Sequence, residues 1–133
     1  GFKKSLPDSD SPHKVLLNHY LKSLVQDQRP VPFVPDELLD WSGLTFFQRS
    51  ILQYLKNHIH KGMLISYSEL ALKAGFPKAA RACGSALAAN PFPLVVPCHR
   101  VISRNGRIGG FQGERQNIDL KRQILEMEGI FSV

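Results

Sequence analysis

Two short helical segments separated by a tight turn are the feature that most constrains the fold of this 133-residue chain. The capping box Ser66-Tyr67-Ser68-Glu69 begins the first segment, and Gly75 ends it. Pro77 suits the first turn of the second segment, which runs to about Ala89 and stops at Asn90-Pro91. This arrangement predicts a helix-turn-helix.

A longer helix is predicted immediately before this unit. The capping box Thr45-Phe46-Phe47-Gln48 begins it, and Lys61-Gly62 ends it. Its apolar residues recur at helical spacing, at Phe47, Ile51, Leu55 and Ile59. Such a stripe indicates a helix that packs one face against a core.

Short extended pieces and a last helix are predicted to follow. Leu94–Val96 and Val101–Ser103 read as extended, and Asn105-Gly106 is a strong hairpin-turn signal. The last helix spans roughly residues 115–128, with Gly129 as its end signal. The predicted fold class is therefore mainly α: a winged-helix-like helix-turn-helix domain with a short β-hairpin near Cys98.

The N-terminal third of the chain is predicted to form a helical arm and a connector. A helical pattern opens at Ser11-Pro12 and places the apolar residues between Leu16 and Leu24 on one face. Arg29 to Pro35 carries three prolines and cannot be helix interior. We therefore divide the chain into the arm and connector, residues 1–43, and the helix-turn-helix domain, residues 44–133.

Charge and cysteine content narrow the partners and the compartment. Lys and Arg number 17 against 11 Asp and Glu, and the net charge of +6 favours nucleic acid or another polyanion as partner, although charge alone fits a protein that merely happens to be basic equally well. Cys83, expected to be structural, and Cys98 are too few for a disulfide framework and fit a reducing compartment. No metal-ligand pattern, membrane-spanning run or signal peptide is visible, so we expect no metal and a cytoplasmic, nucleoid or nuclear location.

A cysteine beside a histidine suggests thiol chemistry. In Pro97-Cys98-His99-Arg100-Val101 the thiol has a possible base next to it, and a thiolate forms near neutral pH only where a base or positive charge favours it. The following basic residues are expected to contact phosphates, or else to form a solvated face: Arg100, Arg104, Arg107, Arg115, Lys121 and Arg122. Read alone, Cys98 could equally be a small buried residue or the nucleophile of a hydrolase.

The second segment of the helix-turn-helix carries almost only small side chains. Residues 78–89 include one internal long cation, Arg81, and lack the several polar side chains that pair with base edges. Small residues permit close approach to a groove without reading its sequence. A buried Ala-rich helix is the alternative, and Arg81 opposes it because an unpaired guanidinium does not belong in a core. A DNA-binding protein with a reactive cysteine could act on a flipped base, with Arg81 filling the hole.

From about Thr45 to Gly129 the chain resembles the O6-alkylguanine-DNA alkyltransferases, also called methylated-DNA–protein-cysteine methyltransferases. The matching motifs are Ile65-Ser66-Tyr67-Ser68-Glu69-Leu70-Ala71, Pro77-Lys78-Ala79-Ala80-Arg81-Ala82, Asn90-Pro91 with Pro93, Pro97-Cys98-His99-Arg100-Val101, Gly109-Gly110-Phe111, and Glu126-Met127-Glu128-Gly129. Their order and spacing together make the match specific. Members usually carry a full N-terminal domain of ribonuclease-H-like fold, and since about 40 residues precede the matching region here, we expect either a short form of that domain or its loss.

The resemblance implies catalytic roles for five residues. Cys98 resembles the acceptor nucleophile, His99 the base that deprotonates it through a water, and Glu128 the carboxylate that orients and charges that histidine. Tyr67 resembles the residue that helps to rotate the nucleotide and hydrogen-bonds guanine N3. Asn90 resembles the hinge that ties the helix-turn-helix to the active-site segment.

Further positions are implied to contact DNA or the flipped guanine. Arg81 matches the finger that replaces the flipped base, and the carbonyls of Cys98 and Val101 would accept from the guanine exocyclic amine. The remaining expected contacts are Ala79, Ala80 and Gly84 in the helix-turn-helix and Gly110, Phe111 and Gln112 in the glycine-rich loop. Phe111 and Gln112 depart from the usual tyrosine and serine or glycine, a difference expected to narrow the pocket.

The implied activity is DNA repair by one irreversible transfer of a methyl or larger alkyl group from guanine O6 to Cys98, with no cofactor. The implied partner is double-stranded DNA containing O6-alkylguanine, bound through the minor groove, largely independently of sequence, by a monomer. Two alternatives stay open: a lesion-sensing DNA-binding module that transfers nothing, and a cysteine hydrolase. The retained Cys98 argues against the first, because such sensors replace the cysteine.

Overall fold

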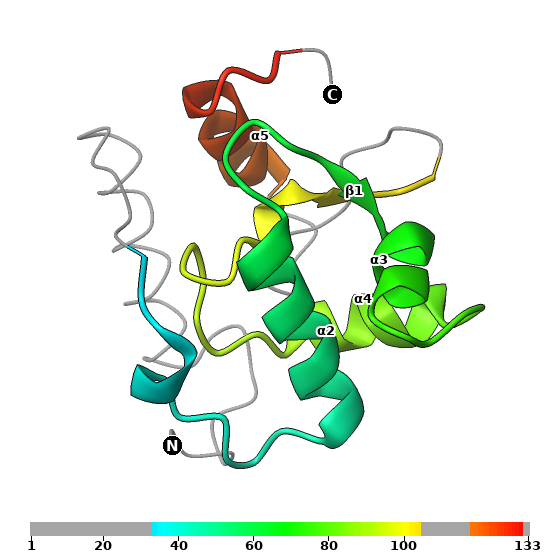
Figure 1. Ribbon diagram of the computed structural model, residues 1–133. Helices are drawn as coiled ribbons and strands as arrows, with labels where there is room; N and C mark the ends of the chain where they lie inside the picture. Colours follow the sequence, from blue (N-terminus) through cyan, green and yellow to red (C-terminus); the bar gives the residue numbers. More distant parts are fainter. Residues whose placement is uncertain (1–32, 105–117, 132–133) are drawn as a thin grey trace.

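A computed structural model describes residues 33–104 and 118–131 of the chain. The elements are the helices α2 (Phe46–His58), α3 (Tyr67–Lys73), α4 (Ala80–Ala88) and α5 (Ile118–Met127), the 3-10 turns η1 (Asp36–Leu38) and η2 (Cys98–Arg100), and the strands β1 (Ile65–Ser66) and β2 (Val101–Ile102). The predicted mainly helical fold is confirmed for this part of the chain (Figure 1). The predicted N-terminal helix lies outside the described residues.

Helix α2 begins where its capping box predicts. The Thr45 hydroxyl accepts from the Gln48 backbone N–H at 3.0 Å, and the Gln48 side chain accepts from the Thr45 N–H at 2.9 Å. The helix ends at His58, and Gly62, with φ +88°, lies in the turn beyond it. The predicted end at Lys61-Gly62 is therefore wrong by one turn, because Ile59 is extended and buried instead of helical.

The helix-turn-helix consists of α3 and α4. The Ser66 hydroxyl accepts from the Glu69 N–H at 3.1 Å and caps α3, and Gly75 turns the chain after it with φ +102°. The predicted start of the second helix at Pro77 is wrong, since α4 begins at Ala80. Lys78 has φ +63°, a left-handed conformation that a right-handed helix cannot include.

A two-stranded parallel sheet joins the start of the helix-turn-helix to the segment after Cys98. In its register Ile65 pairs with Val101 and Ser66 with Ile102. The predicted extended piece at Leu94–Val96 is wrong, because Leu94 has φ +72° and lies in a turn closed by an isolated bridge between Pro93 and Val96. The hairpin predicted around Asn105-Gly106 lies outside the described residues.

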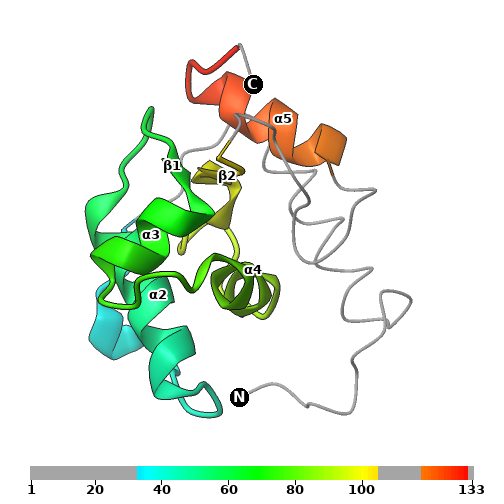
Figure 2. The ribbon, with the colours of Figure 1, turned by 90° about the vertical axis from the view of Figure 1, so that its right-hand side faces the viewer.

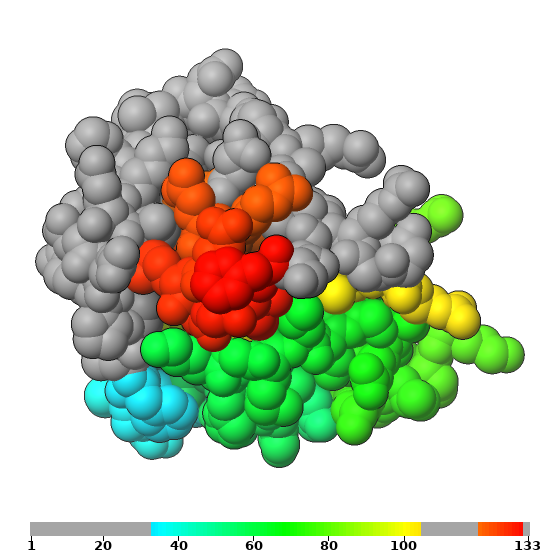
Figure 3. All heavy atoms as spheres, turned by 90° about the horizontal axis from the view of Figure 1, so that it is seen from above, coloured from blue at the N-terminus to red at the C-terminus, as the bar shows by residue number. Residues whose placement is uncertain are grey.

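The core of the domain lies between α2, α3 and α4, and the sheet separates α3 from α5 (Figure 2). Fully buried side chains of α2 and α3 form its centre, among them Ile51, Leu52, Leu55 and Leu70. Seen from above, α5 and the residues after it occupy the middle of one face (Figure 3). The segment that holds Cys98 therefore runs between the helix-turn-helix and α5.

The connector before α2 packs against the same core. Trp41 is buried, donates its indole N–H to the Asp36 carbonyl at 2.8 Å and meets Phe92 edge to face at 5.2 Å. The Asp36 carboxylate accepts from the buried Lys56 ammonium of α2 at 2.7 Å. The division at residue 44 stays a prediction, and these contacts join residues on both sides of it.

Candidate active site

Cys98 and His99 lie in η2, a single 3-10 turn that follows Pro97. The Cys98 N–H donates to the Val96 carbonyl at 2.8 Å, and the Arg100 N–H donates to the Pro97 carbonyl at 2.9 Å. These short-range bonds fix the turn immediately before β2. Cys98 is 6% exposed and His99 1% exposed, so both residues are buried in the domain.

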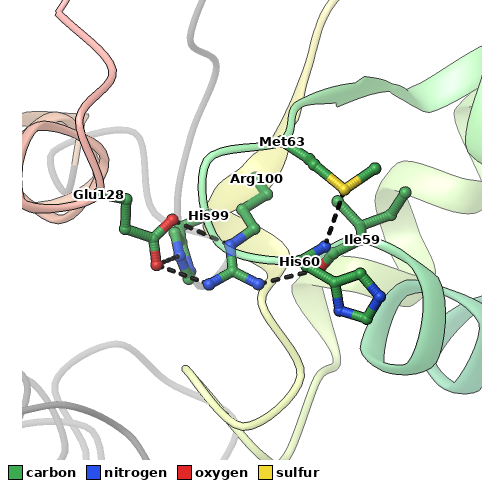
Figure 4. A network of polar contacts seen from close by, with 6 residues as sticks. All are labelled: Ile59, His60, Met63, His99, Arg100 and Glu128. Atoms are coloured by element: carbon green, nitrogen blue, oxygen red, sulfur yellow. Dashed lines mark hydrogen bonds and ion pairs between the residues drawn. The ribbon is translucent and has the colours of Figure 1, made fainter.

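Glu128, one residue after α5, holds the two residues that follow Cys98, His99 and Arg100, in a polar network (Figure 4). Its Oε2 lies 3.1 Å from His99 Nε2. Arg100 donates to both carboxylate oxygens, from Nε to Oε1 at 2.9 Å and from Nη2 to Oε2 at 2.7 Å. The third guanidinium contact is from Nη1 to the Ile59 carbonyl at 2.9 Å. Arg100 thereby joins the end of α2 to the end of α5.

The network fixes the protonation states of its members. Burial alone would raise the pKa of Glu128, but hydrogen bonds from Arg100 and His99 outweigh it and lower that pKa to about 2. Burial lowers the pKa of His99, and the charges of Arg100 and Lys121 lower it further, against the opposing effect of Glu128. His99 is therefore a neutral imidazole facing an ionised carboxylate.

The tautomer of His99 follows from this contact. An ionised carboxylate only accepts hydrogen bonds, so Nε2 carries the proton that it donates to Glu128. The other nitrogen, Nδ1, then holds a lone pair and is the basic atom of the ring. Nδ1 is buried and makes no hydrogen bond within the described part of the chain. A neutral imidazole with an unpartnered basic nitrogen, on the residue that follows Cys98, can accept a proton.

Lys121 of α5 is the residue that the sequence interpretation misplaced. It is fully buried, and its Nζ donates to the Val101 carbonyl at 2.7 Å. The expectation that Lys121 and Arg100 contact phosphates is wrong, because both side chains turn inward. The signal was present in the sequence: Lys121 lies three and four residues before the buried Ile124 and Leu125, on the apolar face of the helix.

Burial lowers the pKa of Lys121 to about 8, and the negative charge of a Cys98 thiolate opposes that shift.

Tyr67, the first residue of α3, also lies within electrostatic reach of the thiol. Burial raises the pKa of its phenol, and the charges of Cys98 and Cys83 add to the effect. A neutral phenol can donate a hydrogen bond. Its ring lies over Gly84 of α4, where an added Cβ would meet Tyr67 Cδ1 at 3.9 Å.

Asn90 ties the end of the helix-turn-helix to the segment that leads to Cys98. Its side-chain amide donates to the Val96 carbonyl at 3.0 Å, and its side-chain oxygen accepts from the Phe92 N–H at 2.9 Å. The residue is buried, so these bonds close residues 90–96 into a compact loop. The role of Asn90 as a hinge stays a prediction.

The remaining predicted residues are divided between the surface and the masked segments. Arg81 is exposed on α4, and Ala79 and Ala80 are half-buried at its start. The Val101 carbonyl, expected to accept from guanine, already accepts from Lys121. Gly110, Phe111 and Gln112 lie outside the described residues.

The described residues offer little support for a second reactive thiol, a metal site or a membrane-spanning helix. Cys83 is fully buried in α4, and burial raises the pKa of its thiol to about 12, which makes it unreactive. Residues 33–104 and 118–131 contain no cluster of His, Cys, Asp and Glu that could hold a metal ion. No helix in the same ranges has both the length and the apolar character to cross a membrane.

Known proteins are similar to this chain in sequence and in fold. A family model described as 6-O-methylguanine DNA methyltransferase, DNA binding domain, matches residues 46–130. A methylated-DNA–protein-cysteine methyltransferase of Methanothermobacter thermautotrophicus is 45% identical over 93 residues, which cover 70% of this chain and 49% of the relative. One of Thermococcus sibiricus is 34% identical over 130 residues, which cover 98% of this chain and 68% of the relative.

Solved structures are similar to this chain as well. The crystal structure of Mycobacterium tuberculosis OGT in complex with DNA matches with a TM-score of 0.59 and 42% identity, over 64% of this chain and 49% of that one. The chain spans about half the length of the first relative it matches. Since the family model covers most of the chain, including α2 to α5, the chain belongs to the 6-O-methylguanine DNA methyltransferase family.

Proposed function

We propose that this protein repairs DNA by transferring a methyl or larger alkyl group from O6 of guanine to Cys98, once per molecule. The observation that carries the proposal is the neutral His99 beside the Cys98 thiol, with Nε2 held by Glu128 and Nδ1 left as a base. Relatives named methylated-DNA–protein-cysteine methyltransferase and a neighbour solved with DNA support the substrate.

The transfer balances without a cofactor. The thiol proton leaves through His99, and the Sγ lone pair attacks the alkyl carbon. The new Sγ–C bond forms as the C–O6 bond breaks, and the electron pair stays on the guanine, which takes up a proton. A thioether has no good leaving group, so Cys98 is consumed.

Each neighbouring residue has a supporting role in this proposal. Tyr67, a neutral phenol beside Cys98, can donate a hydrogen bond to the flipped guanine. Asn90 holds the loop before Cys98 through two buried hydrogen bonds. Arg81 fits a side chain that replaces the flipped base, because it is exposed on a helix with small neighbours.

The proposed DNA contact follows from the same helix. The small residues of α4, Ala79, Ala80 and Gly84 among them, permit close approach to the minor groove without sequence preference. The net charge of +6 supports phosphate binding. The protein would act as a monomer, in the cytoplasm or wherever the DNA is held in a nucleoid or nucleus. Affinity for duplex DNA should fall steeply with salt, because neutralised phosphates release counterions.

Mass spectrometry after incubation with a duplex containing O6-methylguanine tests the proposal. We expect a mass gain of one methylene on the peptide that holds Cys98, at one equivalent per protein. Cys83→Ala should keep the gain, because that thiol is buried and unreactive, and Cys98→Ser should lose it. Folded protein that binds the lesion without gaining mass would instead indicate a sensor, and continued turnover would indicate a hydrolase.

A further inference from the structure

A tryptophan of the connector contacts the loop that leads to Cys98. Trp41 is buried, and its ring meets that of Phe92 edge to face, with the ring centroids 5.2 Å apart. Figure 1 shows the connector around η1 and the chain between α4 and η2 on the same side of α2. A residue that precedes α2 therefore packs on the loop formed by residues 90–96.

Trp41 is itself fixed to the connector and to α2. Its indole N–H donates to the Asp36 carbonyl at 2.8 Å, and the guanidinium carbon of Arg49 lies over its ring, 5.7 Å from the centroid. The Asp36 carboxylate in turn accepts from the buried Lys56 ammonium of α2 at 2.7 Å. The indole is held at its polar edge and over one face, so Phe92 packs against a ring whose orientation is fixed.

Phe92 begins a series of backbone hydrogen bonds that ends at Cys98. Its carbonyl accepts from the Val96 N–H at 2.8 Å, and the Val96 carbonyl accepts from the Cys98 N–H at 2.8 Å. The loop between Phe92 and Val96 contains Leu94, whose φ of +72° is strained for a residue with a side chain. Such a conformation persists only where surrounding contacts impose it. The position of Phe92 therefore bears on the position of Cys98.

We propose that Trp41 is a positioning residue for alkyl transfer: by fixing Phe92, it holds residues 90–96 in the conformation that presents the Cys98 thiol to the alkyl carbon. Displacement at carbon depends steeply on geometry, and an error of about 1 Å can slow a reaction about a hundredfold. The proposed DNA contacts lie on α4, and the buried Trp41 is not among them. Its effect should therefore fall on the rate of transfer and not on DNA affinity. This inference rests on the proposed function, in which Cys98 accepts the alkyl group.

Single-turnover transfer from a duplex containing O6-methylguanine separates these two effects. The rate constant at saturating DNA reports the positioning of Cys98, and the DNA concentration at half saturation reports affinity. Trp41→Leu removes the aromatic ring, and Trp41→Phe keeps one. Phe47→Leu is the matched control, because Phe47 makes the same kind of edge-to-face pair, at 4.8 Å, with Phe76 in the turn between α3 and α4. Circular dichroism checks folding, and Phe92→Leu carries the same test should Trp41→Leu fail to fold.

We expect Trp41→Leu to lower the saturating rate constant at least about tenfold and to leave the affinity for DNA unchanged within about twofold. Trp41→Phe should recover most of the rate, and Phe47→Leu should keep all of it. Phe92→Leu should be as slow as Trp41→Leu, and the double variant no slower than either, because both substitutions break one contact. A Trp41→Leu rate constant equal to that of Phe47→Leu, or losses that multiply in the double variant, would overturn the proposal.

Amide hydrogen exchange tests the same support without DNA. The Val96 and Cys98 N–H groups should exchange at least about tenfold faster in Trp41→Leu, because the loop that holds their acceptors loosens. Phe47→Leu corrects for a general loss of stability. Exchange at these two amides that is no faster in Trp41→Leu than in Phe47→Leu would overturn the proposal. Since this measurement needs no alkyl transfer, a failure of the proposed function and a failure of the support by Trp41 are distinguishable.

Discussion

Replacing Glu128 with glutamine should change how stability depends on pH. The carboxyl pKa falls from an ordinary 4.5 to about 2 in the folded protein, because bonds from Arg100 and His99 outweigh the effect of burial. At about 1.4 kcal/mol per pH unit, this corresponds to about 3 kcal/mol of stability. The Glu128 side chain is 12% exposed, so little of this is screened by solvent.

The sign of the effect follows from the direction of the shift. A carboxyl whose pKa is lowered on folding stabilises the protein fully above its unfolded pKa, here near 4.5, and the contribution disappears as the pH falls toward 2. About 2 kcal/mol of it should be gone by pH 3. Urea unfolding of the unsubstituted protein and of Glu128→Gln, followed from pH 7 to pH 3, measures this as a narrowing gap between their free energies of unfolding.

The gap isolates Glu128 from the other carboxyl groups, which titrate in both proteins. Glu126→Gln is the matched control, because it makes the same chemical change at an exposed residue of the same helix. A gap between Glu128→Gln and the unsubstituted protein that stays constant from pH 7 to pH 3 would refute the reasoning. It would mean that Glu128 ionises alike in the folded and unfolded chains.

Two other contacts give predictions that urea unfolding at pH 7 can check. Asp36→Asn should lower the free energy of unfolding by about 1–3 kcal/mol, because it leaves the buried Lys56 ammonium without a carboxylate. The control Glu37→Gln, at the exposed neighbouring residue, should lower it little. Equal effects of the two substitutions would show that this ion pair does not hold the connector. Asn90→Ala should lower the free energy of unfolding by about 2 kcal/mol or more, because the Val96 carbonyl and the Phe92 N–H lose their buried partner. The control Ser85→Ala, on the exposed surface of α4, should leave that free energy nearly unchanged. A loss for Asn90→Ala no larger than that for Ser85→Ala would contradict the role of Asn90 in closing the loop.

Helix starts that are set by local chemistry could be predicted from the sequence. The Thr45 and Ser66 hydroxyls each bond a backbone N–H three residues ahead, so the residues that begin α2 and α3 are all close in sequence. The start of α4 could not be predicted in this way. Pro77 suits a first helical turn, but the left-handed backbone of Lys78 delays the helix to Ala80, and no residue type in this turn announces that conformation.

The candidate site likewise contains contacts that could be predicted from the sequence and contacts that could not. The pairing of His99 with Glu128 was expected from the resemblance. Their side chains lie 3.1 Å apart, although 29 positions separate the two residues in the sequence. The inward turn of Arg100 and Lys121 was not, because a run of basic residues after a cysteine looks like a phosphate-binding surface. Their actual partners, the Ile59 and Val101 carbonyls, carry no side-chain signature that a sequence motif can reveal.

Helix ends explain why an arginine belongs beside this cysteine. The Ile59 carbonyl lies at the C-terminal end of α2, and Glu128 lies at that of α5, where the partial charge of a helix is negative. A carboxylate at such an end is disfavoured, and burial disfavours it further. One guanidinium, bonded to the carbonyl and to both carboxylate oxygens, offsets all of these charges. Arg100 thus keeps Glu128 ionised, an ionised Glu128 keeps the proton of His99 on Nε2, and Nδ1 stays the basic nitrogen of the ring.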